Sequence, residues 1–375
     1  MGHAYTPGLL VTEKLLITKN RILPLKGDVL VKPGDKVEPD TVVAKTNLPG
    51  PVEPLNVANL LGVPPEDVPL AMLKKEGDPV AAGEVIARTK SFFGLFKSEA
   101  RAKIEGTIES ISSITGQVLL RGHPVPVQVH AYLRGEVVEV FPREGVAVRA
   151  WGTFIQGIFG IGGETHGIVR MAVEKPSDVL DETRITAEHK GCIVVGGSRV
   201  TAEALKKAIS VGACGIVAGG FDDQDLRAFL GKDLGVAITG SEDLGISLVV
   251  TEGFGTIDMA DRTFELLKRS QGKEASVNGA TQIRAGVIRP EVVIPLPEVA
   301  GDRDALHSGE RPGLDVGSPI RVIRDPYFGR LGSVSALPPE LKVLESESKA
   351  RILEVKFPDG SVATIPRANV EALEE

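Results

Sequence analysis

The chain has 375 residues, which is longer than one ordinary hydrophobic core requires and predicts two or three domains. With 42% hydrophobic and 25% charged residues it has a globular composition, which excludes a disordered tail and a membrane bundle. The net charge of −7 argues against a protein that holds nucleic acid by charge alone.

No apolar run approaches the roughly 20 residues that span a bilayer, and no basic segment followed by an apolar one opens the chain. We therefore expect neither a transmembrane segment nor a secretory signal. The two cysteines, Cys192 and Cys214, form no Cys-x-x-Cys pair, which argues against an iron–sulfur cluster and structural zinc. We expect buried thiols, a cytoplasmic location, and no cofactor or bound metal.

The N-terminal third contains an internal repeat. Residues 31–46 read VKPGDKVEPDTVVAKT, and residues 74–89 read KKEGDPVAAGEVIART. In each, Gly-Asp predicts a tight turn, the following valines predict a half-buried strand, and a second turn leads to another strand. Residues 104–112 supply a returning strand with the same alternation. We expect the two segments to form superposable β-hairpin units that are related by a pseudo-two-fold axis.

Over residues 20–125 this pattern resembles the barrel-sandwich hybrid fold of biotinyl and lipoyl domains. It is also similar to the related domain that occurs in bacterial ion-pumping electron-transport complexes. Carrier domains place their modified lysine in an Asp-Lys-Ala or Met-Lys-Met hairpin, and neither occurs here, although Lys90 follows the second repeat. The cysteine clusters of the electron-transport proteins are absent from this sequence.

An apolar cluster follows the second repeat and admits two interpretations. One is that the cluster plugs the core of a neighbouring domain, and the other is that it forms an exposed docking tip for a partner. Its members are Phe92, Phe93, Leu95 and Phe96.

Residues 126–175 continue with β patterning, including two strands at 135–141 and 145–149. A glycine-dense segment follows at residues 157–167. We interpret it as a structural turn in preference to a phosphate-binding loop, because it lacks the Lys-Ser/Thr of a P-loop.

From about residue 185 the pattern changes to buried apolar runs that alternate with helical segments. Runs at 191–197, 214–220, 235–240 and 246–251 predict strands, and helices are expected from Thr201, from Asp222 and over 259–269. Such alternation predicts a small, mainly parallel α/β sheet. Ligands bind beyond the carboxyl ends of such strands. The first of these ends is a possible anion-binding loop, formed by Gly196, Gly197, Ser198 and Arg199.

Residues 317–334 carry the most specific motif, GSPIRVIRDPYFGRLGSV. This segment closely resembles the KOW motif of NusG-type transcription factors and several ribosomal proteins. The resemblance implies a small SH3-like barrel that binds nucleic acid or protein. A hairpin over residues 351–366, with a Pro-Asp-Gly turn, agrees with that assignment.

The residues that we expect to bind a partner lie in or beside the loop of this motif. Arginines and aromatic rings together grip unstacked bases, or a proline-rich or acidic protein segment. The sequence leaves RNA and protein equally favoured, with docking inside the same chain close behind, and it shows no feature that reads DNA sequence. The residues are Arg321, Arg324, Tyr327, Phe328 and Arg330.

The predicted fold class is therefore multidomain, with α/β and all-β parts. We expect a β-rich barrel-sandwich-like region at 1–180, a small α/β domain at 181–300, and an SH3-like barrel at 313–375. The predicted function is that of a non-enzymatic adaptor in a ribonucleoprotein, transcription or other large assembly. The alternative is a ligand-binding or enzymatic α/β domain that the β modules position, and a biotinyl or lipoyl carrier is less favoured.

Overall fold

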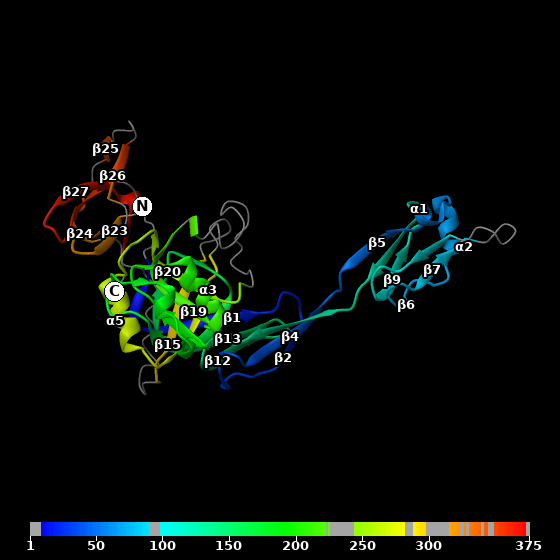
Figure 1. The fold of residues 1–375 in the computed structure, drawn as a ribbon, viewed down its shortest axis with the longest axis horizontal. Helices are drawn as coiled ribbons and strands as arrows, with labels where there is room; N and C mark the ends of the chain where they lie inside the picture. Colours follow the sequence, from blue (N-terminus) through cyan, green and yellow to red (C-terminus); the bar gives the residue numbers. More distant parts are fainter. Residues whose placement is uncertain are drawn as a thin grey trace.

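The computed structural model describes residues 9–89, 98–222, 224–225, 244–281, 288–297, 315–322, 326–327, 330–338, 341–343 and 349–372. The protein is mostly β. Figure 1 shows a central body, an arm of strands that extends from it to a distal lobe, and a separate group of strands near the C-terminus, the C-terminal module (residues 315–372).

The core of the body is a mixed sheet with thirteen strands in the described residues. Its parallel part is as the sequence predicts, because short apolar runs are buried on both faces. The parallel strands are β15 (Glu164–Met171), β17 (Cys192–Val195), β19 (Gly215–Phe221) and β20 (Ser247–Phe254). The two longest described helices pack on this sheet, and they are α3 (Ala202–Val211) and α5 (Asp261–Arg269).

Thr201 caps α3 by accepting the amide of Ala204 at 3.1 Å, and Gly212 ends the helix in a left-handed conformation. Two short strands extend the same sheet, and two 3₁₀ turns lie between its strands. They are β16 (Val179–Leu180), η2 (Glu182–Arg184), η3 (Ala187–His189) and β18 (Arg199–Val200). The helix expected after Asp222 and the strand expected at 235–240 lie largely or wholly outside the described residues.

The sheet of the body includes strands on both sides of the expected boundary at residue 180. The proline-rich stretch at 289–297 contains a core strand, β22 (Glu291–Pro295), whose Val292, Val293 and Ile294 are fully buried. The other added strands pair with β20, β15 or one another. They are β1 (Val11–Ile22), β12 (Gly135–Phe141), β13 (Gly145–Gln156), β14 (Phe159–Ile161) and β21 (Glu274–Asn278).

The glycine-dense segment at 157–167 is largely strand, in β14 and the start of β15, rather than a turn. A Cβ atom on Gly160 would lie 2.6 Å from the carbonyl oxygens of both Leu248 and Gly279. This glycine therefore lets backbones approach one another, and no ligand is needed to explain it.

The arm and the distal lobe contain two nested copies of one β unit. The proximal copy joins β1 to β13 and adds β2 (Asp28–Val29), β3 (Lys36–Val37), β4 (Val42–Leu48) and β11 (Val125–His130). The distal copy, residues 52–121, is inserted between β4 and β11. Its strands are β5 (Val52–Asn56), β6 (Pro79–Val80), β7 (Val85–Arg88), β8 (Glu99–Arg101), β9 (Gly106–Ile111) and β10 (Gln117–Arg121).

The Gly-Asp turns of the two copies have matching geometry. Gly34 and Gly77 have φ angles of 91° and 87°, in the left-handed region that favours glycine. Each donates its amide to the returning strand at 2.7 Å, Gly34 to Val137 and Gly77 to Ile108. Both segments thus form turns and strands, but not the expected hairpins, because β3 and β6 pair with strands outside their own segments.

The match extends beyond the segments that the sequence revealed. In the proximal copy the amide of Ala131 donates to the carbonyl of Thr41 at 2.8 Å. In the distal copy the amide of Ala102 donates to the carbonyl of Glu84 at 2.9 Å. Both copies also have a register shift where β4 pairs with β11 and β7 pairs with β8. The returning segment of the proximal copy, residues 125–156, is thus structurally equivalent to that of the distal copy, residues 99–121.

The repeats are not two halves of one barrel, contrary to the expected pseudo-two-fold relation. Each copy has its own hydrophobic core, and each Gly-Asp segment pairs with its own returning strand. Only the distal copy has helical turns between its first strand and its Gly-Asp turn. They are α1 (Val57–Leu61), η1 (Pro65–Asp67) and α2 (Val68–Ala71).

The C-terminal module is a six-stranded half-barrel with its own core. Its first strand and its later hairpin are where the sequence predicts them. Its elements are β23 (Pro319–Val322), β24 (Leu331–Ala336), β25 (Leu341–Val343), β26 (Lys349–Lys356), β27 (Val362–Pro366), η5 (Arg367–Asn369) and β28 (Val370–Ala372).

Candidate functional site

The outer face of the C-terminal module brings the motif segment against the turn between β26 and β27. Gly332 of the motif is needed for this contact, because its Cβ atom would lie 2.6 Å from Cγ1 of Val355 and 2.9 Å from the carbonyl oxygen of Lys356. The glycine thus allows β24 to lie close against β26.

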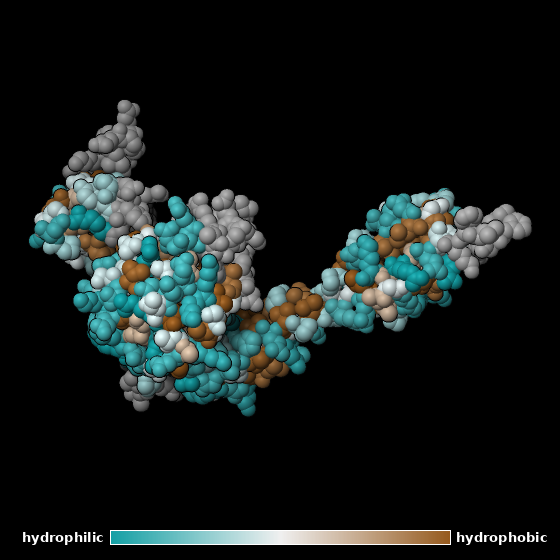
Figure 2. Space-filling model, viewed as in Figure 1, coloured by the Kyte–Doolittle hydropathy of each residue, from teal (hydrophilic) through white to brown (hydrophobic). Residues whose placement is uncertain are grey.

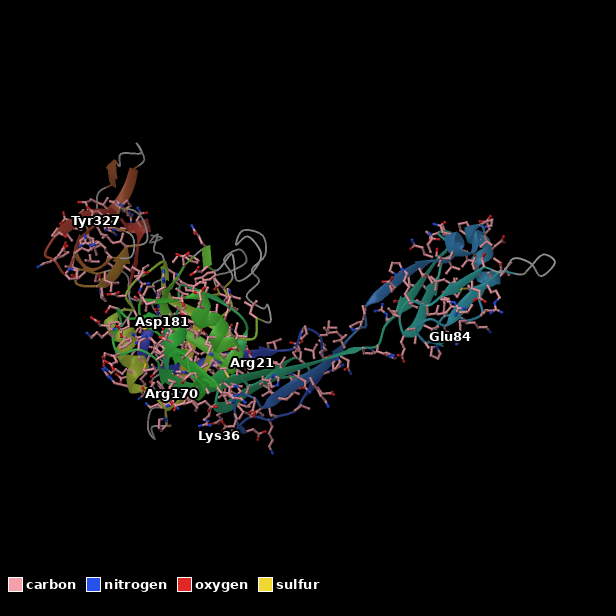
Figure 3. The ribbon with its side chains drawn as sticks, viewed as in Figure 1. Arg21, Lys36, Glu84, Arg170, Asp181 and Tyr327 are labelled. Atoms are coloured by element: carbon pink, nitrogen blue, oxygen red, sulfur yellow. The ribbon has the colours of Figure 1, made fainter. Side chains whose placement is uncertain are left out.

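Arg330 is the central residue of this face. Its guanidinium carbon lies 3.8 Å from the centre of the Phe357 ring and 5.9 Å from that of Tyr327, and the two rings are 5.4 Å apart. Its Nη2 donates to Oδ2 of Asp359 at 2.6 Å. Tyr327 is half-buried, and Figure 3 shows it on this module. The arginine is therefore held by both stacking and an ion pair.

Asp359 is fixed from its other side by the turn. The hydroxyl and the amide of Ser361 donate to its Oδ1 at 2.5 and 2.9 Å. These hydrogen bonds, with a smaller contribution from Arg330, lower the pKa of Asp359 to about 2. The carboxylate is thus charged throughout the neutral range and holds Arg330 in one orientation.

An open groove of about 490 Å³ lies on the same face. Residues of β24 and of the turn between β26 and β27 line it, with the exposed Lys356 among them and with Phe357 buried beneath in the core of the module. The groove therefore offers a lysine and the neighbouring Arg330–Asp359 pair. It is lined by Leu331, Gly332, Ser333, Lys356, Phe357, Pro358 and Gly360.

Arg321 does not belong to this face, which corrects the prediction. It is 3% exposed, and its Nη2 forms an ion pair with Glu252 of the body, which is 2% exposed. Arg321 stands in β23, where alternation turns its side chain away from the groove and into the body. The predicted Arg324 and Phe328 lie outside the described residues, as does the predicted docking tip of Phe92, Phe93, Leu95 and Phe96.

The predicted anion-binding loop is closed, and the amides of Gly196 and Ser198 have protein partners. The amide of Gly196 donates to Val217 and that of Ser198 to Asp178, both at 2.8 Å, and the Ser198 hydroxyl donates to the Ser177 carbonyl at 2.9 Å. A Cβ atom on Gly197 would lie 2.4 Å from the carbonyl oxygen of Asp178. Arg199 belongs to β18 rather than to a loop. The glycines thus make room for protein backbone, which explains the pattern without an anion.

A second open groove, of about 440 Å³, lies on the distal copy. Figure 2 shows apolar side chains interrupting the hydrophilic surface of this lobe and of the arm. Leu70 and Leu73 beside the groove are exposed. The groove is lined by Pro69, Met72, Leu73, Lys74, Lys75, Glu76 and Ile111.

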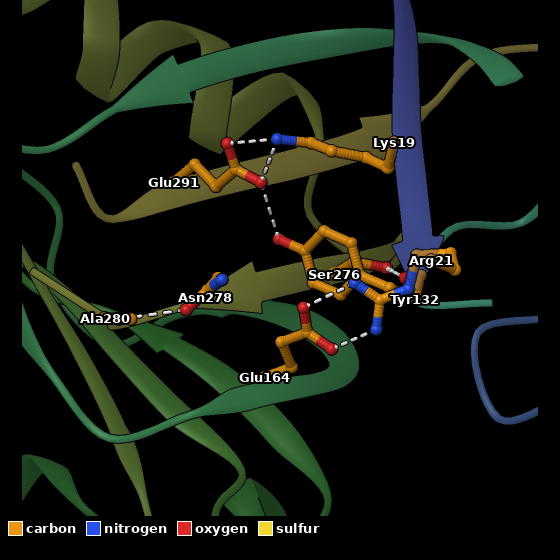
Figure 4. A network of polar contacts seen from close by, with 8 residues as sticks. All are labelled: Lys19, Arg21, Tyr132, Glu164, Ser276, Asn278, Ala280 and Glu291. Atoms are coloured by element: carbon orange, nitrogen blue, oxygen red, sulfur yellow. Dashed lines mark hydrogen bonds and ion pairs between the residues drawn. The ribbon is translucent and has the colours of Figure 1, made fainter. Parts of the chain in front are cut away.

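A polar network joins the proximal copy to the body (Figure 4). The hydroxyl of Tyr132 donates to Oε1 of Glu291 at 3.1 Å, and Lys19 pairs with the same carboxylate at 2.6 Å. Ser276 donates to the Tyr132 carbonyl, and the guanidinium of Arg21 lies 5.4 Å from the tyrosine ring. Burial, and then Glu291, raise the pKa of Tyr132 well above its usual value. The donors and acceptors satisfy one another, so the network acts as a structural junction.

Sequence reasoning missed Glu252, Asp359 and Tyr132. The Pro-Asp-Gly turn that contains Asp359 was visible, but only tertiary packing brings it beside Arg330. Tyr132 has a φ of 68°, which is uncommon for a non-glycine residue, and nothing in its sequence neighbourhood indicates it.

Within the described residues, no group of three or more His, Cys, Asp or Glu side chains is arranged to hold a metal ion. None of the described helices has the length and apolarity to cross a bilayer. Comparison of the chain with protein-family models, with curated proteins and with solved structures finds no match.

Proposed function

We propose that the protein is a non-enzymatic adaptor that binds an extended protein segment in the groove of its C-terminal module. The observation that carries this proposal is the fixed Arg330, stacked on Phe357 and paired with Asp359 at the edge of an open groove. A side chain that is already ordered loses little entropy when a partner binds, so it is well suited to recognition.

The charges beside the groove favour protein over RNA. Asp359 is ionised at neutral pH and offsets the positive charge of Arg330, which weakens attraction for a phosphate backbone, whereas a peptide can bind through backbone hydrogen bonds and contacts with Lys356. RNA binding through Arg330 and Tyr327 is the second candidate, supported by the resemblance to KOW modules.

The remaining parts fit an adaptor. We propose that the half-barrel is an SH3-like module and that the two nested copies are barrel-sandwich units that together form an arm. The ends of the distal hairpin are fixed, since Thr89 and Ser98 exchange hydrogen bonds at 3.1 and 3.0 Å. The chain between them includes four large apolar residues, which we propose as a second contact with the assembly.

The rival ligand-binding α/β domain is less well supported, because the strand-end loop that would hold the ligand is packed with backbone. Retention of a nucleotide or metal after purification would reverse this preference.

The test is capture from native lysate by the full-length chain and by Arg330→Gln/Lys356→Gln. The double variant removes both positive charges at the groove, so we expect recovery of the partner to fall about tenfold or more. Arg351→Gln is the matched control, because it removes an exposed arginine that lies in β26, five residues before Lys356.

Nuclease treatment and two salt concentrations separate the two candidates. A protein partner should remain after nuclease treatment, whereas an RNA partner should be lost and should bind much more weakly at high salt. Equal recovery by wild type and double variant would show that this groove is not the binding face.

A further inference from the structure

We propose that the docked C-terminal module is a releasable closure over the carboxyl end of β20, held by the buried Arg321–Glu252 pair. This inference concerns the face of the module that is turned away from the groove, so it stands apart from the proposed function. Arg321 then holds the module to the body of the same chain and does not bind a partner.

The pair connects three elements. Besides its ion pair with Glu252, Arg321 donates through Nη1 to the carbonyl of Thr251 at 3.2 Å. The other oxygen of Glu252 accepts the amide of Ala260, the residue before α5, at 3.1 Å. Strand β20, helix α5 and the module therefore meet at one carboxylate, and the module supplies its only charged partner in the described residues.

Two features indicate that the contact can open without unfolding either part. The apolar core of the module is separate from that of the body, so no shared hydrophobic core holds them together. The pair is also incompletely satisfied, because Nε of Arg321 is buried without a hydrogen-bond partner. Buried charges that lack some of their hydrogen bonds add little net stability.

Opening would uncover a defined acceptor site. In open parallel sheets, ligands bind beyond the carboxyl ends of the strands. The neighbouring end of β19 stays closed, because Gly219 and Gly220 pack against residues 255–259. Release would thus expose one carboxylate and one carbonyl oxygen, which together accept hydrogen bonds from a cationic group such as a guanidinium.

Carboxylate footprinting of the full-length chain tests this directly. A carbodiimide and glycine ethyl ester modify accessible carboxylates, and mass spectrometry reports the rate at Glu252. Glu291 serves as an internal reference, because it is also buried but belongs to the junction with the proximal copy. In the wild type we expect Glu252 to be modified faster than Glu291, since local opening is easier than global unfolding.

In Arg321→Met the rate at Glu252 should rise about tenfold or more while that at Glu291 stays unchanged. Arg330→Met, on the opposite face of the same module, should leave both rates at their wild-type values. Equal rates in the wild type, an unchanged rate at Glu252 in Arg321→Met, or a parallel rise at Glu291 would each overturn the proposal. Partner capture through the groove is measured separately and does not enter these outcomes.

Discussion

The proximal and distal copies share a backbone but differ in what surrounds it. Equivalent turns, returning strands and register shifts occur in both. The proximal copy is joined to the body by Tyr132, whereas the equivalent residue of the distal copy, Lys103, forms an exposed ion pair with Glu53 at 3.0 Å. The distal copy instead covers its own core with α1 and α2.

The comparison shows that backbone and docking are encoded by different residues. Glycines and the Gly-Asp turns set the common backbone, because they allow close strand approach and left-handed φ angles. A few polar residues then decide whether a copy is fused to a sheet or left on an arm. Matched substitutions in the two copies separate these contributions.

The largest effect is expected from the glycines that begin the returning strands. A Cβ atom on Gly106 would lie 2.0 Å from the Arg121 carbonyl oxygen, and one on Gly135 would lie 2.3 Å from that of Arg149. Each alanine variant should therefore cost about 3 kcal/mol or more. Gly106→Ala should open the distal copy alone, whereas Gly135→Ala should weaken the whole body, since β12 belongs to its sheet.

Hydrogen exchange followed by mass spectrometry distinguishes these outcomes by comparing peptides from residues 52–121 with peptides from β13. Gly163→Ala is the control, because its Cβ atom would meet nothing within 4 Å, and it should change stability by less than about 0.5 kcal/mol. If Gly106→Ala also accelerated exchange in β13, the distal copy would not be an independent folding unit.

The sequence predicted these units only in part. Gly34-Asp35 and Gly77-Asp78 were visible because the turn chemistry is local. The nesting was hidden, because the returning strands share little sequence and an insertion separates the halves of the proximal copy. Strand β22 was not predicted either, since prolines at 290, 295 and 297 lie in or beside it.

The candidate site was predictable to a similar extent. The motif indicated Tyr327 and Arg330, but strand alternation alone did not reveal that Arg321 would enter the body. The face of the C-terminal module that packs on the body is determined by a residue distant in sequence, Glu252. The local sequence around Arg321 therefore does not indicate which face this is.

An intermediate effect is expected at the junction residue. Tyr132→Phe removes the hydroxyl that donates to Glu291 and should destabilise the body by about 2 kcal/mol, since a hydrogen bond to a buried charge is lost. Lys103→Met at the equivalent distal position should change stability by less than about 1 kcal/mol, because exposed ion pairs contribute little. Chemical denaturation measures both; a penalty as large for Lys103→Met would contradict the structural difference between the copies.

The pH dependence of the same variant gives an independent check. Because the pKa of Tyr132 is raised in the folded state, its stabilising contribution is complete below pH about 10, its usual value, and is lost as the pH rises above it. The difference in unfolding free energy between wild type and Tyr132→Phe should therefore shrink above pH 10. A constant difference would show that the hydroxyl is not the source of the effect.

The smallest effect is expected where the copies are most alike. The carboxylates of Asp35 and Asp78 accept the amides of Lys32 and Lys75, at 2.9 and 2.7 Å. Each alanine variant loses one such hydrogen bond and should cost about 1 kcal/mol. Asp40→Ala, which changes an exposed aspartate in the following turn, should cost less than about 0.5 kcal/mol.

Native-state hydrogen exchange reports both turns through equivalent amides. Those of Val137 and Ile108 donate to the carbonyls of Asp35 and Asp78 at 2.9 and 3.0 Å. If the turns are one structural unit used twice, Asp35→Ala should lower protection at Val137 by the same factor as Asp78→Ala lowers it at Ile108. Loss at one amide without comparable loss at the other would mean that the surroundings, and not the shared hydrogen bonds, stabilise the turns, because the local geometry is common to both copies.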